Sequence, residues 1–148
     1  MGGLPGSILF ACTWNSVRSP MAEGLMKSLF GTRLFVDSAG VRRGGSRDPF
    51  AVLVMAEIGI DIGEHRPKTF DDLESGAFDM VVSLSPEAQH RAIELTRADH
   101  CEVEFWHTLD PSIVEGNREA RLLAYRDVRD RLMAQLLERF GPHRPPVV

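Results

Sequence analysis

Short apolar runs alternate along this chain with longer segments of helical periodicity. Four runs are rich in apolar residues and have the length of a buried strand. They span residues 7–11, 34–39, 78–84 and 102–106. Strands that alternate with helices in this way are typical of a parallel sheet whose crossover connections are helices.

Four segments carry the periodicity or the capping residues of helices. Pro20 lies in the first turn of the first, and apolar residues recur there at every fourth position. Asp48 and Ser85 are the expected N-caps of the second and third helices, and Gly59 is the expected end of the second. The expected helices run from Pro20 to about Leu29, from 49 to 57, from 86 to 96 and from 118 to 140, and residues 69–76 are expected to be a short helical or irregular stretch.

The order of these elements predicts one α/β domain. We expect a three-layer sandwich, with a four-stranded parallel sheet and helices on both faces. A length of 148 residues fits a single domain over 1–148, with a core at about 7–140 and flexible ends. The Pro-rich residues 141–146 are expected to be irregular. A ligand is expected at the carboxyl ends of the strands.

The charge pattern limits the classes of partner. The net charge of −4 argues against general nucleic-acid binding. Basic residues nevertheless cluster in one part of the chain, and two interpretations stay open: a solvated basic face, or a patch that steers anionic substrates. The cluster consists of Arg33, Arg42, Arg43, Arg47, Arg66 and Lys68.

The positions of the cysteines and histidines argue against a disulfide-stabilised protein and against a metalloprotein. The two cysteines, Cys12 and Cys101, form neither a disulfide framework nor a metal knuckle. The five histidines lack metal-ligand spacing, so we expect no metal and no cofactor. The first residues do not resemble a signal peptide, and no apolar run has the length of a membrane span. A reducing cytoplasm is the expected location, with no membrane partner.

The segment CTWNSVRS, residues 12–19, carries the strongest chemical signal. It places Cys12 at the end of a strand and Arg18 just before a helix, so backbone N–H groups between them can converge on an anion. Such a site favours the thiolate of a nearby cysteine, and a guanidinium binds phosphate oxygens in a bidentate manner. The alternative is a small buried thiol beside a solvated arginine.

The pattern Cys-x5-Arg-Ser-Pro-Met-Ala-Glu resembles the low-molecular-weight protein tyrosine phosphatases and the thiol-linked arsenate reductases that share their fold. Residues 36–40, 59–66 and 106–111 resemble further family segments, in the right order. The resemblance covers about residues 7–140, nearly the whole chain. It implies a sheet with strand order 2-1-3-4 and metal-free chemistry.

The resemblance also implies roles for individual residues. Cys12 would be the nucleophile and Asp110, in an Asp-Pro loop, the general acid. From its position next to the helix start, Ser19 either donates a hydrogen bond to the thiolate of Cys12 or is an ordinary helix-cap serine. The phosphate would be bound by Arg18 with the backbone of Thr13, Trp14, Asn15, Ser16 and Val17, and a supporting network would consist of Asn15, Ser19, Ser38 and His65.

Three positions depart from the family pattern. Trp14 stands where a glycine is usual, and it either lines the mouth of the site or alters the path of the loop. Val17 stands where many phosphatases have a second cysteine. Ser112 follows the Asp-Pro pair where an aromatic residue is frequent, so few aromatic side chains are available to hold a phosphotyrosine ring.

Three functions are consistent with these residues. The leading one is a metal-free phosphomonoester hydrolase of the protein tyrosine phosphatase type, which forms a phosphocysteine intermediate on a phosphorylated protein or a small phosphomonoester. The alternative is an arsenate reductase that uses Cys12 and a small external thiol, because the chain lacks the cysteine pair that relay-type reductases carry after the third strand. Cys101, at the start of the fourth strand, is expected to be buried rather than to act as a resolving thiol, with Val103 and Phe105 alternating behind it as core residues. A non-catalytic phosphate-binding module is the third, and Asp110 argues against it.

Overall fold

A single parallel sheet forms the centre of the molecule. The computed structural model describes residues 3–43, 45–73, 78–96 and 101–141. Its strands are β1 (Ser7–Cys12), β2 (Phe35–Gly40), β3 (Met80–Ser83) and β4 (Glu102–Phe105). They pair in parallel in the order β2-β1-β3-β4, which confirms the expected topology.

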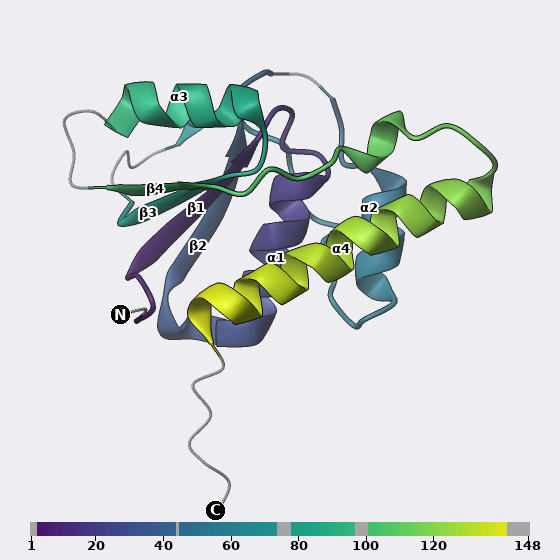
Figure 1. Cartoon of the computed structure of the whole chain (residues 1–148), viewed down its shortest axis with the longest axis horizontal. Coiled ribbons are helices and arrows are strands. Elements are labelled where there is room, and N and C mark those ends of the chain that lie inside the picture. Colours follow the sequence, from purple (N-terminus) through teal and green to yellow (C-terminus); the bar gives the residue numbers. More distant parts are fainter. Residues whose placement is uncertain (1–2, 44, 74–77, 97–100, 142–148) are drawn as a thin grey trace, which may run out of the picture.

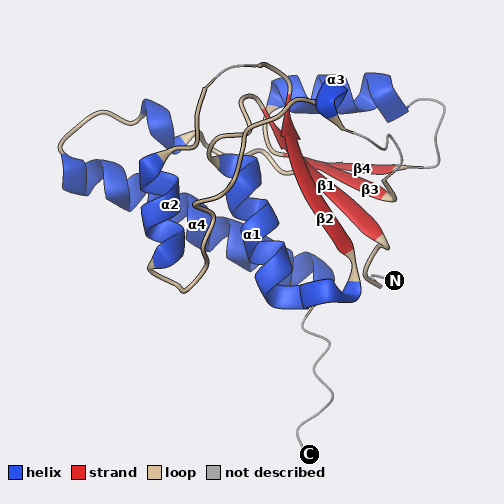
Figure 2. Cartoon of the chain, turned by 180° about the vertical axis from the view of Figure 1, so that it is seen from behind, coloured by secondary structure: helices blue, strands red, loops and turns tan. Residues whose placement is uncertain are grey.

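Helices cover both faces of the sheet, so the expected three-layer sandwich is confirmed (Figures 1 and 2). One face carries α1 (Arg18–Phe30) and α4 (Arg118–Phe140), with α2 (Pro49–Ala56) against α4. The other face carries α3 (Pro86–Thr96). No helix in these described ranges is long and apolar enough to cross a membrane.

The capping residues act as the sequence predicts. The side chain of Asp48 accepts hydrogen bonds from the N–H groups of Phe50 and Ala51 at the start of α2. Ser85 accepts from the N–H of Ala88 in the same way at the start of α3. Gly59 adopts φ of 79°, a left-handed conformation that allows the chain to turn back after α2.

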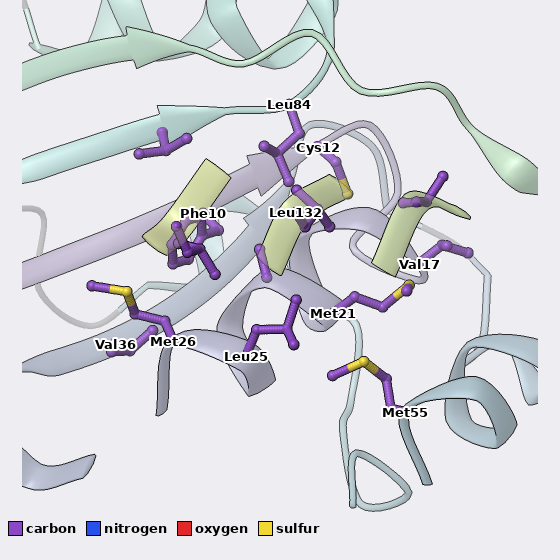
Figure 3. Close-up of a cluster of buried hydrophobic side chains, with 14 of the residues drawn as sticks. Phe10, Cys12, Val17, Met21, Leu25, Met26, Val36, Met55, Leu84 and Leu132 are labelled. Atoms are coloured by element: carbon purple, nitrogen blue, oxygen red, sulfur yellow. The ribbon is translucent and has the colours of Figure 1, made fainter. Parts of the chain in front are cut away.

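The alternation of side chains along β1 divides the core into two parts. Ile8, Phe10 and Cys12 point towards α1 and α4 and join the larger cluster of buried side chains, part of which Figure 3 shows. Leu9 points to the other face and packs in a smaller cluster with Ala92 of α3. Burial of a side chain such as Phe10 contributes about 1.5–3 kcal/mol, so β1 is fixed firmly between the two helical layers.

Two expectations about β4 are wrong. Phe105 was expected to alternate with Val103 as a core residue, but it is 43% exposed. Cys101 was expected to be buried, and it is only partly buried. Both differences arise because β4 is an edge strand: the smaller cluster covers Val103 and leaves the end of the strand open.

The remaining boundaries shift by one or two residues. The short stretch expected at 69–76 contains a single 3-10 turn at Phe70–Asp72. The rest of that stretch and the irregular tail lie largely outside the described residues, as do both ends of the chain.

Candidate active site

Cys12 is the last residue of β1, at the carboxyl edge of the sheet. It pairs with Gly40, the last residue of β2, and is almost completely buried. Its side chain belongs to the lining of a pocket at this end of the sheet. In α/β folds of this kind, ligands usually bind at the carboxyl ends of the strands, where Cys12 lies.

The loop of residues 13–18, called the cradle loop below, follows Cys12 and packs against the end of β2. Thr13 O accepts hydrogen bonds from the N–H groups of Val41 and Arg42. A Cβ atom at Gly40 would lie 2.8 Å from the carbonyl carbon of Trp14, so only glycine permits this close approach. The loop then turns through Asn15, which adopts φ of 57°. Asparagine tolerates this left-handed conformation better than most residues.

The side chain of Asn15 is completely buried and organises the loop from inside. Its Nδ2 donates to Ser19 Oγ and to Ser38 Oγ, each at 2.9 Å. Its Oδ1 accepts from the N–H of Lys68 at 2.9 Å. The Nε2 of His65 lies 2.9 Å from the carbonyl oxygen of Asn15. The structure therefore brings together the four residues of the expected supporting network.

Two hydrogen bonds involve the sulfur of Cys12. Ser19 Oγ lies 2.9 Å from Sγ, and the N–H of Asn15 donates to Sγ at 3.3 Å. A thiolate accepts both bonds, and hydrogen bonds to a charged form stabilise that form. Among the described residues, no side chain caps the N-terminus of α1, so its first N–H groups are available to an anion.

Arg18 and Asp110 line the same pocket as Cys12. Arg18 is buried, and its Nη1 donates to the carbonyl oxygen of Thr108 at 3.0 Å. Its Nη2 lies 3.9 Å from Oδ2 of Asp110. The other carboxylate oxygen of Asp110 accepts from the N–H and the hydroxyl of Ser112. The loop that carries Asp110 thus orients both the guanidinium and the carboxyl group.

These residues line one pocket of about 430 Å³. Its walls come from three parts of the chain: Cys12 with the cradle loop, residues 45–49, and Asp110 with Ser112. This volume suits a small ligand. Trp14 belongs to the pocket lining, so the first of the two roles expected for it, at the mouth of the site, is the one that the structure supports.

The wall at residues 45–49 is attached to α4 through Asp48. While Oδ1 of Asp48 caps α2, its Oδ2 accepts a hydrogen bond from the hydroxyl of Tyr125 at 2.8 Å. Burial and this contact with the carboxylate raise the pKa of Tyr125, so the phenol stays protonated and keeps donating. The ring of Tyr125 also packs edge-on against Phe50.

His65 supports the cradle loop as a neutral residue. Burial lowers its pKa, and the hydrogen bond to the carbonyl oxygen of Asn15 opposes this effect. Because a carbonyl oxygen only accepts, Nε2 must carry a hydrogen in this contact. A protonated imidazolium would retain the bond but would have to be partly desolvated.

Half of the basic cluster pairs with local acidic partners. Arg42 pairs with Glu87 and Arg43 with Asp72, at 2.7 Å in each case. Lys68 pairs with Asp37 at 2.6 Å. For these three residues the contacts favour the solvated basic face over a steering patch. Arg47 differs from them, because it lines the pocket and donates to the carbonyl oxygen of Gly63.

The sequence reasoning missed several residues that complete the site. Thr108 orients Arg18 through its backbone, which residue type does not reveal. Glu23 accepts from Ser38 Oγ at 2.5 Å and so extends the network. The helical position of Glu23, four residues after Ser19, was the available signal, because such residues share a face. The contact between Tyr125 and Asp48 joins positions too far apart for a motif to indicate.

The second cysteine lies far from Cys12. Cys101 precedes Glu102, which pairs with Met80, and Met80 pairs with Ile8 near the start of β1. Cys12 comes four residues later in β1, about 13 Å further along the sheet. The two thiols thus lie at opposite ends of the parallel strands, Cys12 at the carboxyl end and Cys101 at the amino end.

The comparisons with known proteins agree with this geometry. A model of the low molecular weight phosphotyrosine protein phosphatase family matches residues 7–139. The chain belongs to this family. The match covers Cys12, the cradle loop and Asp110, and it confirms the resemblance that the sequence motifs indicate.

Relatives within the family include both reductases and phosphatases. An arsenate reductase of Shouchella clausii is 39% identical over 130 residues, which cover 87% of this chain and 91% of the relative. A solved arsenate reductase in an oxidised state has a TM-score of 0.73 at 26% identity, covering 90% of this chain and 95% of that one. A low molecular weight protein tyrosine phosphatase from T. tengcongensis has a TM-score of 0.71 at 26% identity, covering 89% of this chain and 97% of that one.

The family chemistry centres on a cysteine, which fits the sulfur-centred pocket described above. In the part of the chain that the structure describes, no group of three or more His, Cys, Asp and Glu residues is arranged to hold a metal ion.

Proposed function

We propose that this protein is a cysteine-dependent phosphomonoester hydrolase. The observation that carries the proposal is the shared pocket of Cys12, Arg18 and Asp110, with the carboxyl group of Asp110 only 3.9 Å from the guanidinium of Arg18. A phosphate bound by Arg18 therefore lies beside both a nucleophile and a proton donor. A binding module without catalysis has no use for the third residue.

The reaction proceeds in two steps at this site. The thiolate of Cys12 attacks phosphorus, the ester P–O bond breaks, and Asp110 gives its proton to the leaving oxygen. Asp110 then takes a proton from water, which attacks the phosphocysteine, breaks the S–P bond and releases phosphate. Arg18 and the N–H groups of the cradle loop stabilise the charge on the transferring group.

Arsenate reduction is the second candidate, and the relatives support it. The Shouchella clausii relative is an arsenate reductase, as is one of the structural relatives. Here the thiolate of Cys12 displaces hydroxide from arsenate to give a thiol-arsenate adduct. A small thiol then attacks the sulfur of Cys12, arsenic(V) leaves as arsenic(III) with the electron pair, and a second thiol molecule reduces the mixed disulfide. The position of Cys101 supports an external thiol rather than an internal relay.

A reactive thiol at the centre of the site also supports a cytoplasmic location, where such groups remain reduced. A phosphorylated protein or a small phosphomonoester is the proposed substrate of the hydrolase. For the reductase, the substrates are arsenate and a small thiol.

Two assays on the same preparation separate the candidates. The first measures hydrolysis of p-nitrophenyl phosphate and phenyl phosphate, and the second measures arsenate reduction with an added small thiol. Cys12→Ser is expected to abolish both activities, because a hydroxyl is far less ionised than a thiol. Substantial hydrolysis by this variant would exclude Cys12 as the nucleophile.

The variant Asp110→Asn tests the acid. With phenyl phosphate, a poor leaving group, the rate is expected to fall by about 10²–10⁴-fold. With p-nitrophenyl phosphate the loss is smaller, because that leaving group needs little protonation. Asp71→Asn is the matched control, since the side chain of Asp71 is 81% exposed and lies outside the pocket lining. Equal losses with both esters would contradict the acid role.

A further inference from the structure

Trp14 places a large aromatic ring at the pocket without an evident role in the fold. Its side chain is 44% exposed and lines the pocket together with Cys12 and Arg18. Within the described ranges, no ring–ring or cation–π contact involves Trp14. An aromatic side chain of this size that is half exposed to solvent contributes little to the stability of the fold, which favours a role in ligand binding.

The backbone that carries this ring is firmly held. The preceding carbonyl oxygen, on Thr13, accepts two hydrogen bonds from Val41 and Arg42. The carbonyl carbon of Trp14 itself packs against Gly40, and the next residue is the buried Asn15. The base of the ring is thus fixed two residues from the nucleophile. A ligand that contacts the ring therefore loses less conformational freedom in the protein than it would against a mobile loop.

The other walls of the pocket offer little to an aromatic ligand. Gly45, Ser46 and Ser112 are small, and Trp14 is the only aromatic residue among the described residues that line the pocket. Phe50, the nearest aromatic residue after the wall at 45–49, packs against Tyr125 instead. Pro49 and Arg47 also line the pocket, but among the described lining residues only Trp14 offers an aromatic ring to a flat group bound beside the phosphate.

We infer that Trp14 is the specificity-determining residue of this site, and that its ring stacks on a flat aromatic leaving group of the phosphate ester. The inference rests on the proposed hydrolase function and names the ester class that it prefers. Stacked or edge-on aromatic contacts add to the affinity beyond the area they bury. The cradle loop holds the phosphate of every ester in the same way. Only the leaving group of the ligand therefore contacts Trp14.

The test compares two phosphonates that differ only in the group on phosphorus. Calorimetry measures the binding of phenylphosphonate and methylphosphonate to the wild type and to Trp14→Leu, which keeps apolar bulk but lacks a ring. The affinity for phenylphosphonate is expected to fall by about five- to tenfold, while that for methylphosphonate stays nearly unchanged. Trp14→Phe is expected to retain most of the preference. Leu123→Ala, which removes an exposed apolar side chain from α4, is the matched control and keeps the wild-type preference.

Kinetics with phenyl phosphate supply a second measurement. Because the ring contact is equal in the ground and transition states, Trp14→Leu is expected to raise KM with little change in kcat. Equal weakening of both phosphonates would overturn the inference, since Trp14 would then shape the cradle rather than contact the leaving group. If the wild type binds phenylphosphonate through Trp14 but hydrolyses no ester, the proposed hydrolase fails while the ring contact stands.

Discussion

Replacement of Asn15 by alanine tests the central claim about how the cradle loop is held. The side chain of Asn15 is completely buried and makes three hydrogen bonds, to Ser19, Ser38 and the N–H of Lys68. Its backbone has φ of 57°. Alanine removes all three bonds and leaves a less tolerant residue in the left-handed conformation.

The loss in the free energy of unfolding can be worked out from these contacts. An unsatisfied N–H of Lys68 costs about 1–3 kcal/mol, and each lost bond to Ser19 and Ser38 about 1 kcal/mol at most. The backbone adds about 1 kcal/mol. Allowing for relaxation, the expected loss is about 3–5 kcal/mol, within the stability of a typical domain. The melting temperature is expected to fall by about 10 °C, since each kcal/mol corresponds to about 2–4 °C at this chain length.

Urea unfolding is the assay, with the midpoint compared at constant m. Asn117→Ala is the matched control, because Asn117 is an exposed N-cap of α4 whose Oδ1 accepts a single bond from Ala120. It is expected to cost about 1 kcal/mol. Asn15→Gly removes the same side chain without the strain of a Cβ, so it separates the backbone cost from the hydrogen-bond cost. Equal midpoints for Asn15→Ala and Asn117→Ala would refute the reasoning.

Three further substitutions probe other parts of the molecule. Arg18→Lys is expected to lower kcat/KM for p-nitrophenyl phosphate by about 10²-fold, because a point charge does not replace the bidentate fork, and near-normal rates would exclude Arg18 as a phosphate ligand. Cys101→Ala is expected to leave the activity unchanged; if single-turnover arsenate reduction without added thiol occurs in the wild type and is lost in this variant, Cys101 is the resolving cysteine. For His65, burial lowers the folded-state pKa, so the unfolded chain binds more protons below about pH 6.5 and the free energy of unfolding falls as the pH drops. His65→Gln is expected to flatten that decline in urea titrations, and an unaltered pH profile would contradict this account.

The strands, the helix caps and the Cys-x5-Arg motif were accessible from the sequence because they depend on local patterns, whereas the strand order followed from the family resemblance. Apolar runs and capping residues such as Asp48 and Ser85 act within a few positions of themselves, so their structural effect follows from their spacing. Cys12 and Arg18 are linked in the same way, by one strand–loop–helix segment. Their proximity is a local property of the chain.

Features that depend on tertiary context were not accessible. The exposure of Phe105 follows from the position of β4 at the edge of the sheet, which the residues of that strand do not encode. The bond from Tyr125 to Asp48 joins two helices that are distant in sequence. Thr108 orients Arg18 through a carbonyl oxygen, and every residue has one. In each case the decisive partner is supplied by another part of the fold.

The three walls of the pocket have a consequence for how the chain acquires its reactivity during synthesis. A chain is synthesised from its N-terminus, so Cys12 appears long before Asp110 and before α4. Yet Cys12 packs in the same buried cluster as Leu132 of α4, and Tyr125 of that helix is hydrogen-bonded to Asp48 in the wall beside it. The buried environment of Cys12 is therefore complete only after α4 has been synthesised, and recovery of activity on refolding requires that this helix has docked.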